Sequence, residues 1–391
     1  MKDDSALVHL GRDPEAHHGI VNIPVHHAST VLFPTIDAYK KSGLGIRKYH
    51  SIRYGVNGTP NSFALADAVA QLEGGTGAAV VGSGLAAVTM AMTSVIKSGD
   101  HLLMVDSVYG PTRRFCDLQL RKWGVDVTYY DPFVGKAISA LIKPATRVIF
   151  TESPGSLTFE IQDIPAIVEA AHQKDVLVMM DNTWATPLFF KPFSHGVDIS
   201  IQAGTKYISG CSDQVIGIVT ARTEALFQQI KDTTMVFGEI ASPEQCYLAL
   251  RGMRSMGARL RQQQKATQEI TRWLQSRPEV KRILWPALPE DPGHRLWRRD
   301  FSGASSLFGV ILQTTCEKKV AHMVDNYRYF KIGASWGGYE SLVIPANPKP
   351  IRKAVPWTEE GYLLRYHVGL EDTEDLITDL KEGFERLNER G

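Results

Sequence analysis

Short apolar runs alternate with helical patterns through the middle of the chain. Between residues 65 and 72 apolar side chains recur every three or four positions, which predicts a helix capped by Asn61 or Ser62 and ended by Gly74–Gly75. Apolar strands are predicted at 78–81, 101–105, 147–151 and 176–181, and further helices at 84–97 and from Pro111 onward. This alternation is typical of a doubly wound α/β domain whose parallel sheet is covered on both faces.

The two ends of the chain follow other patterns. Beyond about residue 245 come a basic helical stretch (258–275), strands near 281–285 and 307–313, and a charged helix at 373–388, which together favour a smaller α+β domain. The first 58 residues are rich in His, Gly and Pro and lack the apolar runs of a core. We therefore expect an arm at 1–58, a large domain at 59–245 and a small domain at 246–391.

Composition and charge exclude several classes of protein. The 391 residues are 43% hydrophobic, which suffices for two buried cores, and the net charge of +1 gives no reason to expect a nucleic-acid partner. No apolar run approaches the roughly 18 residues that span a bilayer, and the apolar stretch of a signal peptide does not follow Met1, so we expect neither a signal peptide nor a membrane partner.

Neither the cysteines nor the histidines predict a metal site. The cysteines lie far apart without CxxC spacing, which favours reduced thiols in a cytoplasmic protein; they are Cys116, Cys211, Cys246 and Cys316. The paired histidines at 17–18 and 26–27 lie in the arm and lack an enclosing cluster. We expect no metal.

Polar residues follow three of the predicted strands, at 82–84, 152–154 and 181–183. The carboxyl ends of parallel strands meet at one edge of a sheet, where ligands bind. A helix that opens at Gly84 would offer its N-terminus to an anion such as a phosphate.

Four further residues suggest chemistry at this edge. Lys206 follows an apolar strand among small residues, and a partly buried lysine has a lowered pKa that suits Schiff-base formation and proton transfer. Asp181 could keep a pyridine nitrogen protonated, and Tyr109 could stack on such a ring. Arg365 lies within an apolar strand, where a substrate carboxylate would match its guanidinium. Taken singly, each has a simpler explanation: a solvated lysine, a turn cap, a packing tyrosine and an internal salt bridge.

A shorter motif would instead indicate a different class of enzyme. Gly82, Gly84 and Ala87 match the GxGxxA pattern of nicotinamide oxidoreductases, with Asp106 near the place of a ribose-binding acid. That fingerprint normally opens the first strand–helix unit, whereas an arm and a helix precede it here. A non-catalytic interaction scaffold is a further alternative, which the presence of Lys206, Asp181 and Arg365 disfavours.

Taken together, these residues resemble the Cys/Met-metabolism family of pyridoxal-5′-phosphate (PLP) enzymes from about Tyr54 to Gly383. The segments that carry the resemblance are 72–77, 152–156, 181–184, 202–213, 335–341 and 367–372, of which the block around Thr205–Lys206–Tyr207 is the most specific. The resemblance implies a PLP-transferase-like fold of the aspartate aminotransferase type. Its large domain would hold a mostly parallel seven-stranded sheet, beside a smaller α+β C-terminal domain.

The resemblance also implies roles for individual residues. Lys206 would bind PLP covalently, Asp181 would pair with the pyridine nitrogen and Tyr109 would stack on the ring. The phosphate would be held by the backbone of Gly84 and Leu85 with Thr205, and Thr183 would adjoin the cofactor. The substrate carboxylate would meet Arg365, Ser335 and Trp336. Tyr54 would reach the active site of a neighbouring subunit in a homotetramer built from two dimers.

The implied reaction is α,β-elimination of L-cystathionine, or of related cysteine S-conjugates, to a thiol such as homocysteine, pyruvate and ammonia. Lys206 would act as the base, and the activity would belong to transsulfuration and methionine biosynthesis. Sister activities stay open: cystathionine γ-lyase or γ-synthase, methionine γ-lyase, sulfhydrylase and cysteine desulfhydrase. Ser335–Trp336 and the stretch 154–157 resemble β-lyases more.

The chain departs from the family near Tyr54. Val56 stands where an arginine commonly contacts the phosphate of the partner's cofactor, and Asn57 removes a positive charge near the distal end of the substrate. Arg113 and Arg114 follow Tyr109 closely enough to rebuild a distal carboxylate site, and Arg114 is the better candidate, although both could be solvated helix residues. Ala334 stands where some members have tyrosine, which would widen the pocket.

Overall fold

The computed structural model describes residues 1–42 and 48–389, without the side chain of Lys48. Its large domain is built on a seven-stranded sheet in the order β1-β7-β6-β5-β4-β2-β3. The strands are β1 Gly77–Val81, β2 His101–Val105, β3 Asp126–Tyr130, β4 Thr146–Glu152, β5 Leu177–Asp181, β6 Ile199–Gln202 and β7 Gly217–Ala221. Only β7 runs antiparallel to its neighbours, which confirms the mostly parallel sheet.

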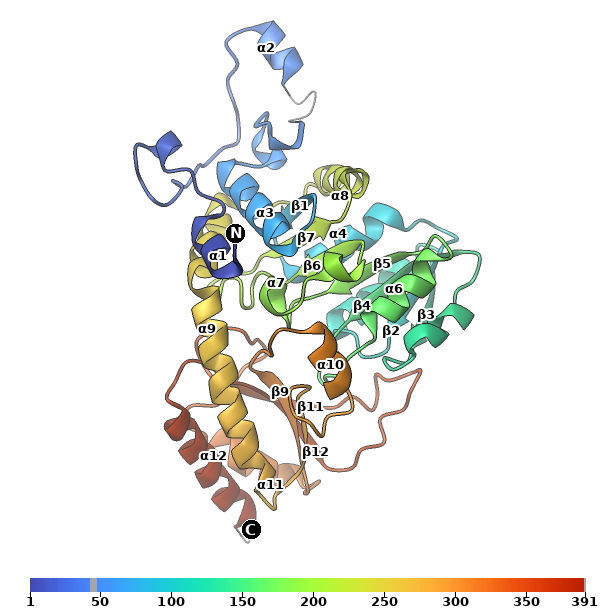
Figure 1. The fold of residues 1–391 in the computed structure, drawn as a ribbon, viewed down its shortest axis with the longest axis vertical. Helices are drawn as coiled ribbons and strands as arrows, with labels where there is room; N and C mark the ends of the chain where they lie inside the picture. The colour runs from blue at the N-terminus through green and yellow to red at the C-terminus, as the bar shows by residue number, and fades with distance from the viewer. Residues whose placement is uncertain (43–47, 390–391) are drawn as a thin grey trace.

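Helices cover this sheet, and some of them start near the strand ends that carry polar residues (Figure 1). Their bounds are α3 Pro60–Glu73, α4 Gly84–Val95, α5 Gly110–Phe115, α6 Ile164–His172, α7 Thr186–Phe189 and α8 Glu224–Phe237. The residue before α3 is Thr59 rather than Asn61 or Ser62, because Pro60 takes the first helical position and Ser62 Oγ accepts the Thr59 N–H at 2.9 Å.

The C-terminal part holds a second sheet in the order β10-β11-β12-β9-β8. Its strands are β8 Val280–Leu284, β9 Leu307–Leu312, β10 Lys331–Ile332, β11 Leu342–Ala346 and β12 Tyr362–His367. The helices are α10 His294–Asp300, α11 Glu317–Asp325 and α12 Thr373–Asn388. This arrangement confirms a smaller α+β part.

A single long helix, α9 (Pro243–Gln275), runs from the large sheet to the small one (Figure 1). It begins 15 residues before the expected stretch at 258, and the expected domain boundary at 245–246 falls inside it. The added part of the helix packs closely on the turn that carries Lys206. At Gly252 a Cβ would lie 2.1 Å from the Ser209 carbonyl oxygen, so only glycine allows this approach.

The N-terminal arm contains short helices, α1 Asp3–His9 and α2 Ile36–Lys41. Leu7 of α1 is buried and the helix packs on α9, whereas the region of α2 projects away from the rest of the chain (Figure 1). In the described ranges, none of the helices is both long and apolar enough to cross a membrane, and His, Cys, Asp and Glu nowhere gather in a group of three that could hold a metal.

Candidate active site

A cavity of about 440 Å³ opens at the carboxyl edge of the large sheet, between it and the small domain. Ten of the twelve site residues expected from the sequence line it: Gly84, Leu85, Tyr109, Asp181, Thr183, Thr205, Lys206, Ser335, Trp336 and Arg365. The carboxyl edge of the parallel sheet, where a ligand was expected, therefore does carry a cavity.

Lys206 lies in a turn that follows β6, with its amine inside the cavity. Nζ donates to Ser335 Oγ at 2.8 Å and lies 5.2 Å from the centre of the Trp336 ring. Burial lowers the pKa of the amine to about 8, helped by the charge of Arg365 and opposed by Asp181. A lysine with this pKa is partly neutral near physiological pH, as a nucleophile or base must be.

Asp181 ends β5 and is held by its neighbour Thr183. Its Oδ1 accepts the backbone N–H of Thr183 at 3.0 Å and the hydroxyl at 2.5 Å, and the same hydroxyl accepts the Ala203 N–H at 2.8 Å. Burial raises the pKa of Asp181, while these bonds and Lys206 oppose the rise. Thr183 thus ties the carboxylate to the turn that leads to Lys206.

Glu152 is a second carboxyl at this edge, with no role expected from the sequence. It lies beside Asp181 in the register of β4 and β5, and its Oε2 accepts the Tyr109 N–H at 2.8 Å. Burial first, and then the charge of Asp181, raise the pKa of Glu152 well above its usual value. The position of Glu152 at the end of a parallel strand is the feature of the sequence that could have placed it at the site.

The opposite end of the cavity is suited to an anion. The first amides of α4, those of Gly84 and Leu85, have no acceptor one turn earlier, and the dipole of this 12-residue helix favours negative charge. A Cβ on Gly84 would lie 2.6 Å from Ala203 Cβ, so only glycine lets the helix approach the turn. Thr205 lines this end, but its hydroxyl already bonds Ile216 O at 3.1 Å and Ile216 N at 2.9 Å.

Arg365 enters the cavity from β12 of the small domain. Its Nη2 donates to the carbonyl oxygens of Ala334 at 3.1 Å and Ser335 at 3.2 Å, while the buried Nε has no partner. Within the described residues no carboxylate pairs with it, and burial lowers its pKa to about 10. A buried guanidinium without an anion is suited to bind one.

Tyr109 precedes α5 and is 45% exposed at the cavity. Burial, then the carboxyls of Glu152 and Asp181, raise its pKa, so the phenol stays protonated.

His367 is a further residue near Arg365, and no role was expected for it from the sequence. It is buried two residues after Arg365 on β12, and its Nε2 accepts the Gly337 N–H at 3.1 Å. Burial lowers its pKa to about 3, so the ring is neutral.

Several expected residues lie outside the cavity. Tyr54 is 52% exposed on the arm, and Arg114 is exposed on α5. The suggestion that Arg113 reaches the pocket is wrong, because its Nη2 donates to Asp106 Oδ1 at 2.7 Å and its guanidinium lies 3.8 Å over the Tyr129 ring. Asp106 is buried in that contact, so it is not free to bind a ribose.

The chemistry of the donor set fits PLP. Asp181 is a half-buried carboxyl at the cavity that forms no ion pair in the described part of the chain, as a pyridinium partner requires. Lys206 supplies an amine for the aldehyde, Tyr109 an aromatic ring and α4 an anion site for the phosphate. The oxidoreductase alternative lacks its ribose-binding acid.

Comparisons with known proteins agree with this site. The family model "Cys/Met metabolism PLP-dependent enzyme" matches residues 4–385. The chain is 46% identical to a putative cystathionine beta-lyase of Rhizobium johnstonii (97% of this chain, 95% of the relative) and 39% identical to a cystathionine beta-lyase of Escherichia coli (99% of each). It is also 40% identical to an L-alanine/L-glutamate racemase of Wolbachia pipientis (99% and 98%).

Solved structures support the fold as well. A cystathionine gamma-lyase from Lactobacillus plantarum, complexed with L-serine, superimposes with a TM-score of 0.90 at 29% identity over 99% of each chain. The cofactor of such an enzyme is PLP, as the family description states. The chain belongs to the Cys/Met-metabolism family of PLP-dependent enzymes.

Proposed function

We propose that this enzyme is a carbon–sulfur lyase that converts L-cystathionine, or a related cysteine S-conjugate, to a thiol, pyruvate and ammonia by α,β-elimination. The observation that carries the proposal is that one cavity holds both a guanidinium without an anion and an amine with a lowered pKa. Arg365 is a buried cation with an unpaired Nε, and Lys206 is an amine with a pKa of about 8. Together they suit a substrate that carries a carboxylate and a removable α-proton.

Arg365, Ser335 and Lys206 act directly on the substrate. When bound, PLP supplies a conjugated ring that accepts electrons from the α-carbon of the substrate. Arg365 binds the α-carboxylate, with Ser335 and Trp336 alongside. Lys206 removes the α-proton as general base, and Ser335 orients its amine through their 2.8 Å hydrogen bond. As the α-proton leaves, the bond between the β-carbon and sulfur breaks and the sulfur departs with its electron pair.

Other residues hold the cofactor. Asp181 keeps the ring nitrogen protonated, and Thr183 fixes that carboxylate with two hydrogen bonds. The amides of Gly84 and Leu85 bind the phosphate, and Thr205 contributes if its hydroxyl exchanges Ile216 for the phosphate. Tyr109 stacks on the ring and stays protonated because its pKa is raised.

Elimination at the β-carbon is favoured over the γ-activities by sequence distance. Relatives named cystathionine beta-lyase share 32–46% identity with the chain, whereas the γ-synthase and γ-lyase structures share 29%. A β-elimination also needs a single base at the α-carbon, a role that Lys206 alone can fill. The Wolbachia relative makes amino-acid racemisation a second activity to measure.

The products of cystathionine turnover test the proposal. The PLP-loaded enzyme is incubated with L-cystathionine, and 2-oxo acids and thiols are quantified together. Equal amounts of pyruvate and homocysteine are expected, and Lys206→Ala should abolish both. Formation of 2-oxobutyrate and cysteine would instead assign γ-elimination. Formation of D-alanine from L-alanine without thiol release from cystathionine would assign the racemase activity.

The arm supports assembly into the expected homotetramer with shared active sites. Large apolar side chains on it face solvent in the single chain, namely Ile20 (54% exposed), Val21 (56%), Leu32 (89%) and Ile36 (75%). An apolar segment of this kind gains by packing on another copy. Light scattering of the full chain is expected to give a tetramer, and deletion of residues 1–58 a smaller species.

We also infer a cytoplasmic enzyme. Cys211 and Cys316 are free and exposed thiols, a state that a reducing compartment preserves. Export of the native protein from the cell, measured by fractionation, would contradict this inference.

A further inference from the structure

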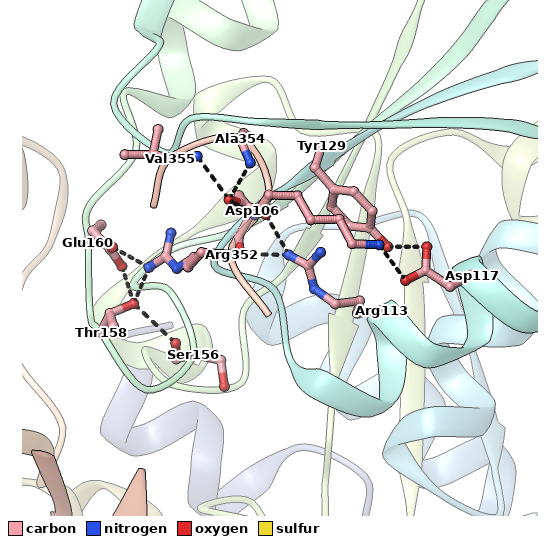
Figure 2. A network of polar contacts seen from close by, with 11 residues as sticks. Asp106, Arg113, Asp117, Tyr129, Ser156, Thr158, Glu160, Arg352, Ala354 and Val355 are labelled. Atoms are coloured by element: carbon pink, nitrogen blue, oxygen red, sulfur yellow. Dashed lines mark hydrogen bonds and ion pairs between the residues drawn. The ribbon is translucent and has the colours of Figure 1, made fainter. Parts of the chain in front are cut away.

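A segment of the small domain, residues 352–355, binds the large domain at Asp106 and at the loop that holds Thr158 and Glu160 (Figure 2). The buried carboxylate of Asp106 accepts the backbone N–H groups of Lys353 at 2.9 Å, Ala354 at 2.8 Å and Val355 at 3.2 Å. Arg113 supplies the cation that balances this carboxylate, at 2.7 Å. Asp106 is three residues from Tyr109 in the cavity.

Arg352 makes a second contact beside the first (Figure 2). Its Nη2 donates to Thr158 Oγ1 at 2.5 Å and pairs with Glu160 Oε1. The Arg352 and Glu160 side chains are only 4% and 12% exposed. A buried ion pair of this kind matters most when one partner is removed, because the other is left without a counter-charge.

The loop that Arg352 binds is a strained wall of the cavity. Leu157 and Phe159 line the cavity and have φ angles of 66° and 59°, in the left-handed region that residues other than glycine avoid. Strained residues at a site persist only where their surroundings hold them. Thr158 and Glu160 alternate with these two residues and are the partners of Arg352.

The same wall is joined to the cofactor side of the cavity. Ser156 N donates to Ser107 O at 2.8 Å, and Tyr109 N donates to Glu152 at 2.8 Å. The small domain also supplies Arg365 from β12, ten residues after the segment 352–355. The contacts of this segment therefore connect the strained wall, the Tyr109 strand end and the domain that carries Arg365.

We propose that Arg352 and Glu160 are positioning residues for the amino-acid substrate. Their ion pair holds loop 155–160 in its strained form and sets the small domain, with Arg365, against the large-domain wall. The assignment rests on the proposed role of Arg365 in binding the substrate carboxylate. Neither residue lines the cavity, so neither touches substrate or cofactor.

Binding of glycine, an amino acid with no leaving group, tests the role without any elimination. Glycine is titrated into the PLP-loaded enzyme and followed by visible absorbance, beside the KM and kcat for cystathionine. Glu160→Gln and Arg352→Met are expected to raise the Kd for glycine and the KM about tenfold or more, with kcat and PLP affinity changed less than about threefold. Arg352→Lys keeps the charge and should recover part of the loss.

Arg299→Met is the matched control. Arg299 also joins the two domains, through a 2.7 Å ion pair with Asp163, but neither residue lines the cavity, and their side chains form no hydrogen bond or ion pair with loop 155–160. Its glycine Kd should match the parent.

Two results would overturn the proposal. One is a glycine Kd within about twofold of the parent in Glu160→Gln; the other is lower thermal stability with unchanged glycine binding, which would make the pair purely structural. If Arg352→Met does not fold, the glycine Kd of Glu160→Gln alone decides whether the proposal holds. If the parent eliminates nothing from cystathionine yet the variants lose glycine binding, the proposed reaction fails and the positioning role stands.

Discussion

Glu152 gives the sharpest prediction, because two carboxyls lie side by side at the sheet edge. Glu152 and Asp181 are paired in the register of β4 and β5, and burial together with the Asp181 charge raises the pKa of Glu152 well above its ordinary value. Between the ordinary and the raised pKa, the folded protein keeps a proton that the unfolded chain has lost. Stability of the folded state therefore falls as pH rises through that window.

Replacing Glu152 with glutamine removes this proton but keeps an oxygen that can accept the Tyr109 N–H. One proton corresponds to at most about 1.4 kcal/mol per pH unit, so from pH 5 to pH 7 the variant should gain up to about 2.7 kcal/mol relative to the parent. The cavity solvates part of both side chains, which makes this the upper bound. Because the two carboxyls titrate together, the gain belongs to the pair.

Urea unfolding of the cofactor-free protein at pH 5, 6 and 7, at one protein concentration, measures the effect. The quantity to compare is the free energy of unfolding of the variant minus that of the parent. Glu382→Gln, at an exposed position on α12, serves as the control and should give a difference that does not change with pH. If the difference in the free energy of unfolding between Glu152→Gln and the parent is also the same at all three pH values, a raised pKa for Glu152 is refuted.

Three further predictions concern the substrate and the amine. Arg365→Leu should lower kcat/KM for cystathionine about 100-fold, chiefly through KM, because the α-carboxylate loses its cation; an unchanged KM would contradict this role. Arg114→Ala should raise KM for cystathionine but not for S-methylcysteine, which has no distal carboxylate, and equal effects on both would remove Arg114 from the distal site. In the cofactor-free enzyme, the Lys206 amine has a pKa of about 8 and is protonated below it. The rate of PLP attachment should therefore fall about tenfold per pH unit below that value, as stopped-flow absorbance would show, and a pH-independent rate would contradict it.

The local pattern of the chain predicted many of the elements and the residues that line the candidate site. The strand at 101–105 and the helix at 373–388 agree residue for residue with the structure, because each depends on periodicity within one segment. Lys206 and Asp181 were expected at the site because they follow strands of the parallel sheet, whose ends converge on one edge, whereas Arg365 was expected because a charged residue within an apolar strand needs a partner. The start of α9 was missed although Cys246, Ala249 and Leu250 are buried at helical spacing, because Gly252, which weakens a helical pattern in sequence, is there to let the helix approach the Lys206 turn.

Only the tertiary structure decided which partners the charged side chains take. Arg113 and Arg114 are neighbours in sequence, yet one is buried against Asp106 and the other is exposed. Asp106 in turn binds Lys353, which lies 247 positions further along the chain. Glu152 acquires its raised pKa from its burial in the folded protein and from the charge of Asp181 on the adjacent strand. Such pairings arise from how whole domains pack, and no periodicity within a single segment records them.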